Sequence, residues 1–368
     1  MNSFPDGWHI KPLSEVVSIQ RGFDLPHHAR RPGPFPVLTS GETGGFHDEG
    51  PIKGPGVTIG RATNLGQPKW SEGDFWPHNT TMFVKDFRGN HPRWVYHYFE
   101  NTDLAGYDSG SVQPMLNRNY IAHIPVLVPS TQEQRAIADV LGALDDKIAV
   151  NSKLAETSDE LVSLHFRRAI ESEGTASRPL FEAIDIDFGE PFGGSDFSAP
   201  GIGRPLIRIR DLKTFTSQVW TTEIRSREIL VQPGDVVVGM DAEFRPTSWL
   251  GEPGLLNQRV CRARGKSTGP AFVRETLREP LRRIEGYKAA TTVIHLNKKD
   301  LQEAEVLVPD TESLELFEAS VEGLYSRRVA VAIENRALEA VRDALLPQLM
   351  SGKLRVRDAE KVLENAGV

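Results

Sequence analysis

Arginine and amide side chains cluster around two β-branched runs in the second half of the sequence. One cluster contains Arg204, Arg208, Arg210 and Lys213, and the other contains Asn257, Gln258, Arg259, Arg262 and Arg264. Alternate residues of a strand share a face, so we expect Arg208 and Arg210 to line one surface. The same holds for Arg262 and Arg264. Because Arg, Asn and Gln fit the edges of guanine and adenine, the clusters as sets indicate base contact, although a solvated or salt-bridged position is the commoner role of any single member.

Basic and amide residues outside these clusters extend the candidate surface to both halves of the chain. His27 and His28, followed by Arg30 and Arg31, form a polar segment that is available to phosphates. The complete set of candidates for nucleic-acid contact is Arg30, Arg31, Arg61, Asn64, Lys69, Arg118, Arg208, Arg210, Lys213, Arg245, Asn257, Gln258, Arg262, Arg264, Lys298 and Lys299.

Motifs for catalysis are incomplete. Gly265–Thr268 resembles the end of a phosphate-binding loop, but that motif needs a glycine where Val260 stands. The carboxylates Asp241, Glu243 and Glu252 have no lysine at the short spacing of a nuclease site, so we interpret them as a solvated loop. The sequence also lacks the glycine-rich loop and the Asn-Pro-Pro-aromatic or Asp-Pro-Pro-aromatic segment of an amino-methyltransferase. We predict no catalytic residue.

Histidine and cysteine spacing predicts no metal site. His91 and His97 lie six residues apart on one expected helix and therefore on different faces. The single cysteine, Cys261, permits neither an internal disulfide nor a cysteine-based zinc site, and we interpret it as a small buried hydrophobe.

The chain contains an internal repeat. Leu116–Pro129 lines up with Leu296–Pro309 at an offset of 180 residues without a gap, and Pro12–Leu13 faces Pro179–Leu180 at an offset of 167. A duplication of this length fixes the architecture. We therefore expect two related domains that differ by loop insertions.

Each half has a Gly/Pro-rich part with short β-branched runs, interrupted late by one helix. The expected strands are Phe35–Thr39, Gly56–Gly60, Leu206–Arg210, Asp235–Met240 and Gln258–Arg262, and the expected helices are Pro92–Phe99 and Ala271–Leu277. A small mixed sheet in each half is the predicted result.

Long segments with a helical period follow each half, from Gln132 to Ile170 and from Ser313 to Met350. Each could form one helix of about 40 residues, roughly 60 Å long. We expect the two helices to pair as an antiparallel coiled-coil spacer; the alternative is separate helices, each packed on its own domain. The fold class is thus α+β, divided into a first domain at 1–129, a first spacer helix at 130–174, a second domain at 175–309, a second spacer helix at 310–357 and a partly ordered tail at 358–368.

Charge and hydropathy bound the remaining possibilities. The net charge is −7, but residues 1–129 hold 11 basic against 12 acidic side chains and residues 175–309 hold 19 against 18. The excess acid therefore lies in the helical segments, away from the candidate surfaces. The apolar runs are far shorter than the roughly 20 residues of a membrane span, and the N-terminus lacks an apolar signal core, so we expect a cytoplasmic protein.

Recurring strings cover nearly the whole chain. They are Ser111–Asn117, Pro129–Arg135 and Leu144–Asn151 in the first half, Pro205–Leu212, Pro233–Phe244, Leu255–Arg262 and His295–Leu301 in the second, and Leu345–Arg355 near the end. In this order they resemble the specificity subunits of type I restriction–modification systems. One departure is that Gln132–Arg135 after Pro129 becomes Ser313–Leu316 after Pro309, so the second helix is expected to contact partners differently.

This resemblance implies a non-catalytic DNA-binding subunit with two target recognition domains that read a split target across a fixed gap. The implied partners are two methyltransferase subunits, which bring S-adenosylmethionine, and restriction subunits, which use ATP and magnesium; this chain is expected to bind no cofactor itself. The acidic helices would serve as docking surfaces. The docking candidates are Gln132, Gln134, Arg135, Asp145, Asp146, Asn151 and Asn335.

Other classes remain open at this point. The chain could be the specificity component of a type IIB-like or phage-defence methylation system, which the neighbouring genes would distinguish. A structural coiled-coil adaptor would have no use for two diverged arginine-rich domains. A free-standing DNA enzyme would show methyl transfer or cleavage by the isolated chain.

Overall fold

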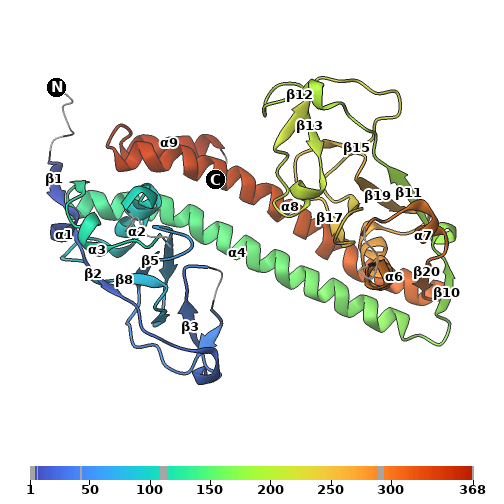
Figure 1. The fold of residues 1–368 in the computed structure, drawn as a ribbon, viewed down its shortest axis with the longest axis horizontal. Helices are drawn as coiled ribbons and strands as arrows, with labels where there is room; N and C mark the ends of the chain where they lie inside the picture. Colours follow the sequence, from blue (N-terminus) through green and yellow to red (C-terminus); the bar gives the residue numbers. More distant parts are fainter. Residues whose placement is uncertain (1–4, 6, 42–43, 108–113, 289–293, 367–368) are drawn as a thin grey trace. The chain divides into compact units, whose positions relative to one another are not determined.

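The structure is a computed structural model that describes residues 5, 7–41, 44–107, 114–288 and 294–366. The chain divides into two compact units. Unit 1 comprises Met1–Ile148 together with Ala337–Val368, and unit 2 comprises Ala149–Arg336. Both division points fall inside long helices, so each unit contains part of each long helix (Figure 1).

Unit 1 contains a four-stranded antiparallel sheet in the order β2-β8-β5-β6, a three-stranded sheet in the order β4-β3-β7 and the pair β1-β9. Its strands are β1 (His9–Pro12), β2 (Ser18–Arg21), β3 (Phe35–Leu38), β4 (Phe46–His47), β5 (Gly56–Gly60), β6 (Pro68–Ser71), β7 (Trp76–Pro77), β8 (Thr81–Asp86) and β9 (Pro125–Val128). Its shorter helices are α1 (Leu13–Val16), α2 (Pro92–Glu100) and α3 (Arg118–Ile121).

Unit 2 repeats this plan with a four-stranded sheet in the order β11-β19-β16-β17, a five-stranded sheet in the order β12-β14-β13-β18-β15 and the pair β10-β20. Its strands are β10 (Ala176–Pro179), β11 (Ile184–Phe188), β12 (Phe197–Ser198), β13 (Arg204–Ile207), β14 (Val219–Thr221), β15 (Leu230–Val231), β16 (Val236–Gly239), β17 (Pro246–Ser248), β18 (Gly254–Leu256), β19 (Val260–Gly265) and β20 (Glu305–Val308). Its shorter helices are α5 (Leu180–Ala183), α6 (Pro270–Lys288) and α7 (Lys298–Gln302).

The sequence repeat corresponds to a repeat of strand pairing. In unit 1, Phe23 bridges to His78 in parallel, and in unit 2 Glu190 bridges to Asn257 in the same way. The glycine before each bridge has no room for a side chain: a Cβ on Gly22 would lie 2.2 Å from the His78 carbonyl oxygen. Gly189 meets the Asn257 carbonyl oxygen at 2.1 Å. The two units therefore share the same backbone arrangement at this bridge, and in both units it requires a glycine directly before the bridge.

The two long helices are α4 (Thr131–Ile170) and α8 (Thr311–Met350), each of 40 residues. In unit 2 they run antiparallel, because Asn151 near one end of this part of α4 donates to Glu334 and Phe166 near the other end packs against Phe317. The Phe166 and Phe317 rings also contact Phe272 of α6, with ring centroids 5.8 to 6.4 Å apart. The prediction of an α+β fold with two paired long helices is confirmed.

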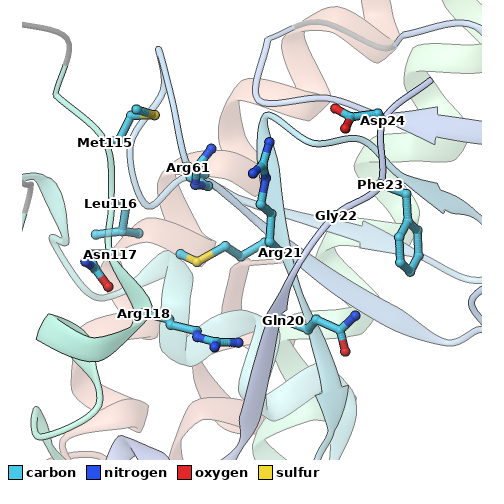
Figure 2. Close-up of a pocket in the computed structure, with 11 residues that line it drawn as sticks. Gln20, Arg21, Gly22, Phe23, Asp24, Arg61, Met115, Leu116, Asn117 and Arg118 are labelled. Carbon is cyan, nitrogen blue, oxygen red and sulfur yellow. The ribbon is translucent and has the colours of Figure 1, made fainter. Parts of the chain in front are cut away.

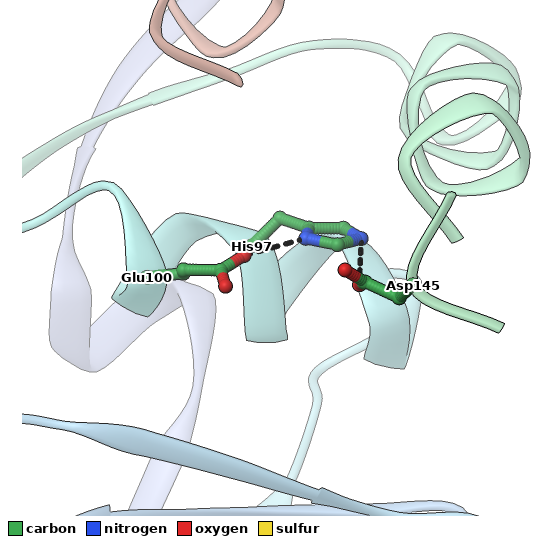
Figure 3. A group of neighbouring side chains, drawn as sticks. All are labelled: His97, Glu100 and Asp145. Carbon is green, nitrogen blue, oxygen red and sulfur yellow. Dashed lines mark hydrogen bonds and ion pairs between the residues drawn. The ribbon is translucent and has the colours of Figure 1, made fainter. Parts of the chain in front are cut away.

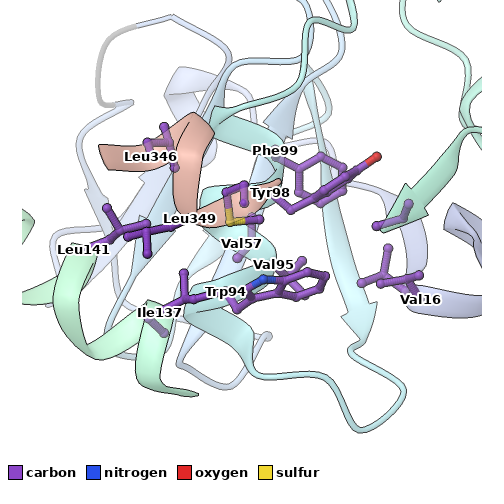
Figure 4. Close-up of a cluster of buried hydrophobic side chains, with 14 of the residues drawn as sticks. Val16, Val57, Trp94, Val95, Tyr98, Phe99, Ile137, Leu141, Leu346 and Leu349 are labelled. Carbon is purple, nitrogen blue, oxygen red and sulfur yellow. The ribbon is translucent and has the colours of Figure 1, made fainter. Parts of the chain in front are cut away.

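In unit 1 the long helices and α2 share one hydrophobic core (Figure 4). Trp94 of α2 is fully buried in it, together with Leu141 of α4 and Leu349 of α8. Side chains of this size each contribute about 1.5–3 kcal/mol when buried. Packing against α2 therefore fixes both helices at this end of the domain.

The end of the chain differs from the prediction. The second long helix ends at Met350 rather than at residue 357. Residues 358–366 of the expected tail lie within a further helix, α9 (Val356–Ala366), and its last two residues lie outside the described residues. The break occurs at Gly352, whose φ of +69° is a left-handed conformation that ends helices. Ala359 of α9 is buried in the core of unit 1, so this segment packs because it is amphipathic.

Within the described residues, no helix has the length and apolar character that crossing a membrane requires.

Candidate nucleic-acid interface

Three arginines of unit 1 converge on a pocket of about 700 Å³ (Figure 2). Arg21 is the last residue of β2, Arg61 follows β5, and Arg118 is the first residue of α3. β2 and β5 both pair with β8, so their ends lie close together. The Leu116 amide donates to the Arg61 carbonyl oxygen at 2.9 Å, which brings the start of α3 to the same place.

The pocket carries positive charge that the protein does not neutralise. Among the described residues, no carboxylate lies within 4.0 Å of the guanidinium groups of Arg21, Arg61 or Arg118, whereas most other arginines have such a partner. Burial, and then the positive charge of Arg21, lower the pKa of Arg61. Asp24 also lines the pocket, but its carboxylate accepts a hydrogen bond from Asn79. Such a group of arginines fits the oxygens of a phosphate.

The sequence singled out two of these arginines but missed Arg21. Arg21 lies in the run Ser18–Arg21, which is too short and too polar to be recognised as a strand. Its proximity to Arg61 follows from pairing of β2 and β5 with β8, which no local pattern reveals. The signal that could have found Arg21 is the glycine after it. Gly22 corresponds to Gly189 at the repeat offset of 167 residues, so it marks the end of a repeated strand.

Other candidates in unit 1 are occupied by internal contacts. Arg31 donates to Asp48 at 2.6 Å and to Glu49 at 2.8 Å. The hydrogen bond from Arg31 to Asp48 lowers the pKa of Asp48. Arg30 donates to the Gly44 carbonyl oxygen, and Lys69 donates to that of Gly41. Asn64 donates to the Ser40 carbonyl oxygen at 2.8 Å. These side chains fix loops of the protein, so the expectation of a free polar segment at Arg30–Arg31 is not met.

The first arginine cluster of unit 2 differs from the predicted strand face. β13 ends at Ile207, and Arg208 begins a short 3-10 helix over Ile209–Leu212. The Arg208 side chain turns back to Asp211, with Nε 3.4 Å from Oδ2. Arg208 and Arg210 therefore do not line one strand face, because Asp211 closes a turn that the alternating pattern does not show.

The second cluster lies on β19 as predicted, but it is an ion-pair network. Arg262 donates to Asp187 at 2.8 Å and lies 3.4 Å from Asp235, with only 16% of its side chain exposed. Arg264 donates to the same Asp187 oxygen at 3.1 Å. The two arginines do share a face, but the carboxylates of β11 and of the turn before β16 hold that face.

The remaining candidates of unit 2 are exposed, apart from the half-buried Asn257. Arg210, Gln258 and Lys298 have no ion pair in the part of the chain that the structure describes. Lys213 and Arg245 both lie near Glu243, at 3.9 and 3.7 Å. In addition, Lys299 lies 3.7 Å from Glu303, and Asn257 accepts a hydrogen bond from the Gln258 amide. These weak surface contacts leave the side chains available to a ligand.

Several partner-docking candidates have internal roles instead. Gln134 is buried, accepts a hydrogen bond from the His91 amide at 2.8 Å and donates to Asn90. Asn151 is also buried and donates to Glu334. These amides fasten the helices to the rest of their own units and cannot reach a partner.

The other docking candidates divide in the same way. Asn335 donates to Ser152, and Asp145 and Asp146 pair with arginines within unit 1. Gln132 and Arg135 lie exposed on the first turns of α4 and are the members of the set that face outward.

A buried charged group that the sequence did not predict joins α2 to α4 (Figure 3). His97 is fully buried, with Nδ1 3.1 Å from Glu100 and Nε2 3.8 Å from Asp145. Arg342 of α8 approaches Asp145 at 3.2 Å, and burial raises the pKa of Asp145. Each ring nitrogen faces a different carboxylate and an arginine supplies the positive charge, so the geometry is that of an ion-pair network rather than of a metal site. The Glu100 spacing was visible in the sequence, but Asp145 comes from a distant helix.

Cys261 is fully buried on β19, and burial raises the pKa of its thiol to about 12. This confirms its interpretation as a small buried hydrophobe. At neutral pH the thiol stays protonated and unreactive.

Comparisons with known proteins agree with these features. Residues 5–157 match the family described as "Type I restriction modification DNA specificity domain". The EcoBI specificity subunit of Escherichia coli is 30% identical over 215 residues, which are 55% of this chain and 44% of that protein. This chain therefore spans less than half the length of that relative. The MjaIX specificity subunit of Methanocaldococcus jannaschii is 20% identical over 310 residues, or 72% of this chain and 69% of that protein.

A solved structure shares the fold along almost the whole chain. The S subunit of a type I restriction–modification system from M. genitalium superposes with a TM-score of 0.67 at 13% identity, covering 95% of this chain and 97% of that one. At this identity the likeness concerns the fold alone.

A duplicated α+β domain combined with two long helices is the fold that this chain shares with the S subunit of a type I restriction–modification system. The resemblance to the specificity subunits of type I restriction–modification systems, which the sequence motifs indicate, is confirmed.

Proposed function

We propose that this chain recognises a split target in double-stranded DNA and directs methyltransferase subunits, and restriction subunits where its system has them, to that target. It would do so in the cytoplasm without catalysing a reaction itself. The observation that carries the proposal is the pocket formed by Arg21, Arg61 and Arg118, whose three guanidinium groups have no carboxylate partner among the residues that the structure describes.

Phosphate binding is the chemistry that this pocket supports best. Contacts to phosphates position a protein on DNA, and contacts to base edges provide sequence specificity. The arginine pocket would supply the first kind of contact in unit 1. Exposed residues that are not tied to carboxylates, such as Arg210 and Gln258 in unit 2, would supply the second.

The two units would read different sequences because equivalent positions hold different side chains. Arg21 and Phe188 are equivalent, since each is the last residue of its strand and pairs opposite Met82 or Cys261 on the neighbouring strand. Arg61 likewise corresponds to Met240, since the carbonyl oxygen of each accepts a hydrogen bond at the start of the following segment. Arg118 corresponds to Lys298, so unit 2 has none of the three arginines and keeps a positive charge at only this one of the three positions.

The long helices would fix the number of unread base pairs between the two parts of the target. Both α4 and α8 are continuous across the boundary between the units. Half-sites that one rigid protein reads lie about one DNA turn, roughly 34 Å, apart. Lengthening both helices equally would therefore change the gap and leave the bases that are read unchanged.

Partner subunits would bring the cofactors, namely S-adenosylmethionine with the methyltransferase and ATP with magnesium in a restriction subunit. Gln132 and Arg135 are the docking candidates that remain exposed on α4. Their position beside the buried Gln134 would let a partner bind without disturbing the helix.

The test is to co-express the chain with the methyltransferase subunit encoded beside it and to map methylated bases across the host genome by long-read sequencing. We expect a split motif with a constant gap. A continuous motif would mean that one unit does not read DNA, and absence of methylation would count against the proposal. An Arg21→Ala, Arg61→Ala double variant should abolish methylation while still co-purifying with the methyltransferase.

A further inference from the structure

Unit 2 contains a second arginine-lined pocket, with a volume of about 430 Å³, at the junction of α4, α6, α8 and β17. Arg274, Arg278 and Arg282 lie on α6, Arg328 lies on α8, and Arg245 precedes β17. These five arginines belong to one compact unit. None of them is equivalent to the arginines of the unit 1 pocket.

The carboxylates around this pocket are unevenly distributed over its arginines. Asp159 and Glu285 line the pocket, Glu275 contacts Arg274 and Arg278, and Glu279 and Glu243 lie beside the exposed Arg282 and Arg245. Glu285 is already engaged as the acceptor of the Phe244 amide at 2.9 Å.

Asp159 is shared by three guanidinium groups. Arg274 and Arg328 both contact its Oδ1, the latter at 3.1 Å from Nε, and Arg278 lies 3.7 Å from Oδ2. Arg274 and Arg278 also contact Glu275, at 2.8 and 3.0 Å, so two carboxylates serve these three cations. Repulsion among those cations would be relieved by a further anion.

Two of these cations are buried. The Arg274 side chain is 2% exposed and lies over the ring of Tyr325 at 5.9 Å. The Arg328 side chain is 14% exposed, and its Nη1 is buried without a hydrogen-bond partner among the described residues. Burial, and then the charge of Arg274, lower the pKa of Arg328. A buried donor on a charged group without an acceptor is costly, so an acceptor at this point would stabilise the protein.

Arg278 and Arg282 lie four residues apart on α6 and so share one face of the helix, at the open side of the pocket. Arg282 is 79% exposed and, among the described residues, its ion-pair partner is Glu279, three residues earlier on the helix. Arg245, on the opposite side, is 77% exposed. These side chains are free to move over a ligand that enters.

We propose that this pocket binds a phosphoryl anion, with Arg274 and Arg328 as its charged floor and Arg245, Arg278 and Arg282 at its entrance. A phosphoryl group offers several oxygen acceptors to the forked donors of arginine, and its negative charge would stabilise guanidinium groups that lie close together. The group could belong to the backbone of duplex DNA or to a free phosphorylated compound. The inference does not depend on the proposed reading of DNA by unit 1.

The first experiment is a calorimetric titration of the full chain with inorganic pyrophosphate at constant ionic strength, with chloride as the comparison salt. We expect Arg278→Gln combined with Arg282→Gln to weaken pyrophosphate binding by about tenfold or more, because charge-assisted hydrogen bonds are lost. The matched control is Arg283→Gln, since Arg283 lies on the same helix, also contacts Glu279 and is 74% exposed, but does not line the pocket. It should bind like the wild type.

A second titration with a short duplex that lacks the target identifies the source of the group. Weaker duplex binding by the double variant, with a salt dependence reduced by about two ions, assigns the site to the DNA backbone. Unchanged duplex binding with lost pyrophosphate binding assigns it to a free phosphorylated compound. The proposal is overturned if pyrophosphate binds no better than chloride, or if Arg283→Gln weakens binding as much as the double variant.

Two further measurements distinguish a true loss of pyrophosphate binding from unfolding of the α6 variants and from failure of the proposed function. Arg245→Gln lies on the β17 side, contacts only Glu243 and should weaken pyrophosphate binding by itself even if the α6 variants unfold. The genome-wide methylation map tests the proposed function independently. An intact split motif together with no pyrophosphate binding would reject this site and leave the proposed function standing.

Discussion

Arg61 lies beside Arg21 in the pocket of unit 1, where burial and the positive charge of Arg21 both lower the pKa of Arg61. Two like charges held together, with no carboxylate between them among the described residues, are unfavourable for the free protein. An anion that enters the pocket would relieve this cost. The same arrangement therefore explains both the strain in the free protein and the expected gain on binding phosphate.

Replacing Arg61 by alanine should weaken DNA binding by the complex of this chain with its methyltransferase. If Arg61 contacts phosphate, the loss should be about equal on target and non-target duplexes, and the salt dependence should fall by about one ion. Binding measured at several salt concentrations checks this. Lys85→Ala, at an exposed site on β8 outside the pocket, should change little. Weaker binding to the target duplex alone would mean that Arg61 contacts a base rather than a phosphate.

Gly22→Ala should destabilise unit 1 and reduce its contribution to recognition. Its Cβ would lie 2.2 Å from a backbone oxygen, so the strand end that carries Arg21 must shift, at a cost of about 1–3 kcal/mol. Urea unfolding and the methylation map together check this. Gly73→Ala is the control, since nothing lies within 4 Å of its Cβ. Equal effects of the two variants would contradict the close-approach explanation.

Arg342→Met should destabilise unit 1 by about 2–4 kcal/mol, because the half-buried carboxylates of Asp145 and Glu100 lose the guanidinium group that lies 3.2 and 4.0 Å from them. The raised pKa of Asp145 also gives the variant a pH dependence. A carboxyl whose folded pKa lies above its unfolded value contributes stability in acid and loses it as the pH rises through the folded pKa. Because Arg342 lowers the pKa of Asp145, its removal should raise that pKa further. The variant should therefore lose more stability than the wild type as the pH rises.

Urea unfolding as a function of pH measures this effect, with the exposed Arg357→Met as control. A variant that is equally destabilised at every pH would show that Arg342 acts by packing rather than through its charge.

Asp310→Asn should make unfolding of unit 2 less dependent on pH. The Asp310 carboxylate accepts hydrogen bonds from the Ser313 amide at 2.9 Å and from its hydroxyl at 2.8 Å at the start of α8, and the former is the main cause of a pKa of about 2. The Asp310 carboxylate therefore contributes to the free energy of unfolding at pH values above its ordinary pKa of 3.8. This contribution is lost as the pH falls through about 2.

The wild type should be more stable than Asp310→Asn at pH 7, and the difference should shrink once the pH falls below about 4. Urea midpoints from pH 7 to pH 3 measure it. A constant difference over this range would mean that the carboxylate charge at the helix start has no role.

Much of the fold was predictable because it depends on local or repeated patterns. The helical period of Gln132–Ile170 anticipated α4, which ends at the same residue, and the run Gly56–Gly60 forms β5 with the predicted bounds. The 180-residue repeat anticipated two domains with one strand order. Such features follow from side-chain periodicity and turn residues, which a sequence displays directly.

The tertiary structure alone decided which basic side chains are free. Arg208 and Arg262 looked equivalent to Arg61 in the sequence, yet Asp211 and Asp187 bind the first two and no carboxylate within the described residues reaches the third. Gln134 and Asn151 looked like docking residues but are buried. The physical reason is that availability depends on neighbours from distant segments. Whether a charged side chain is available to a ligand therefore depends on which opposite charges folding brings beside it.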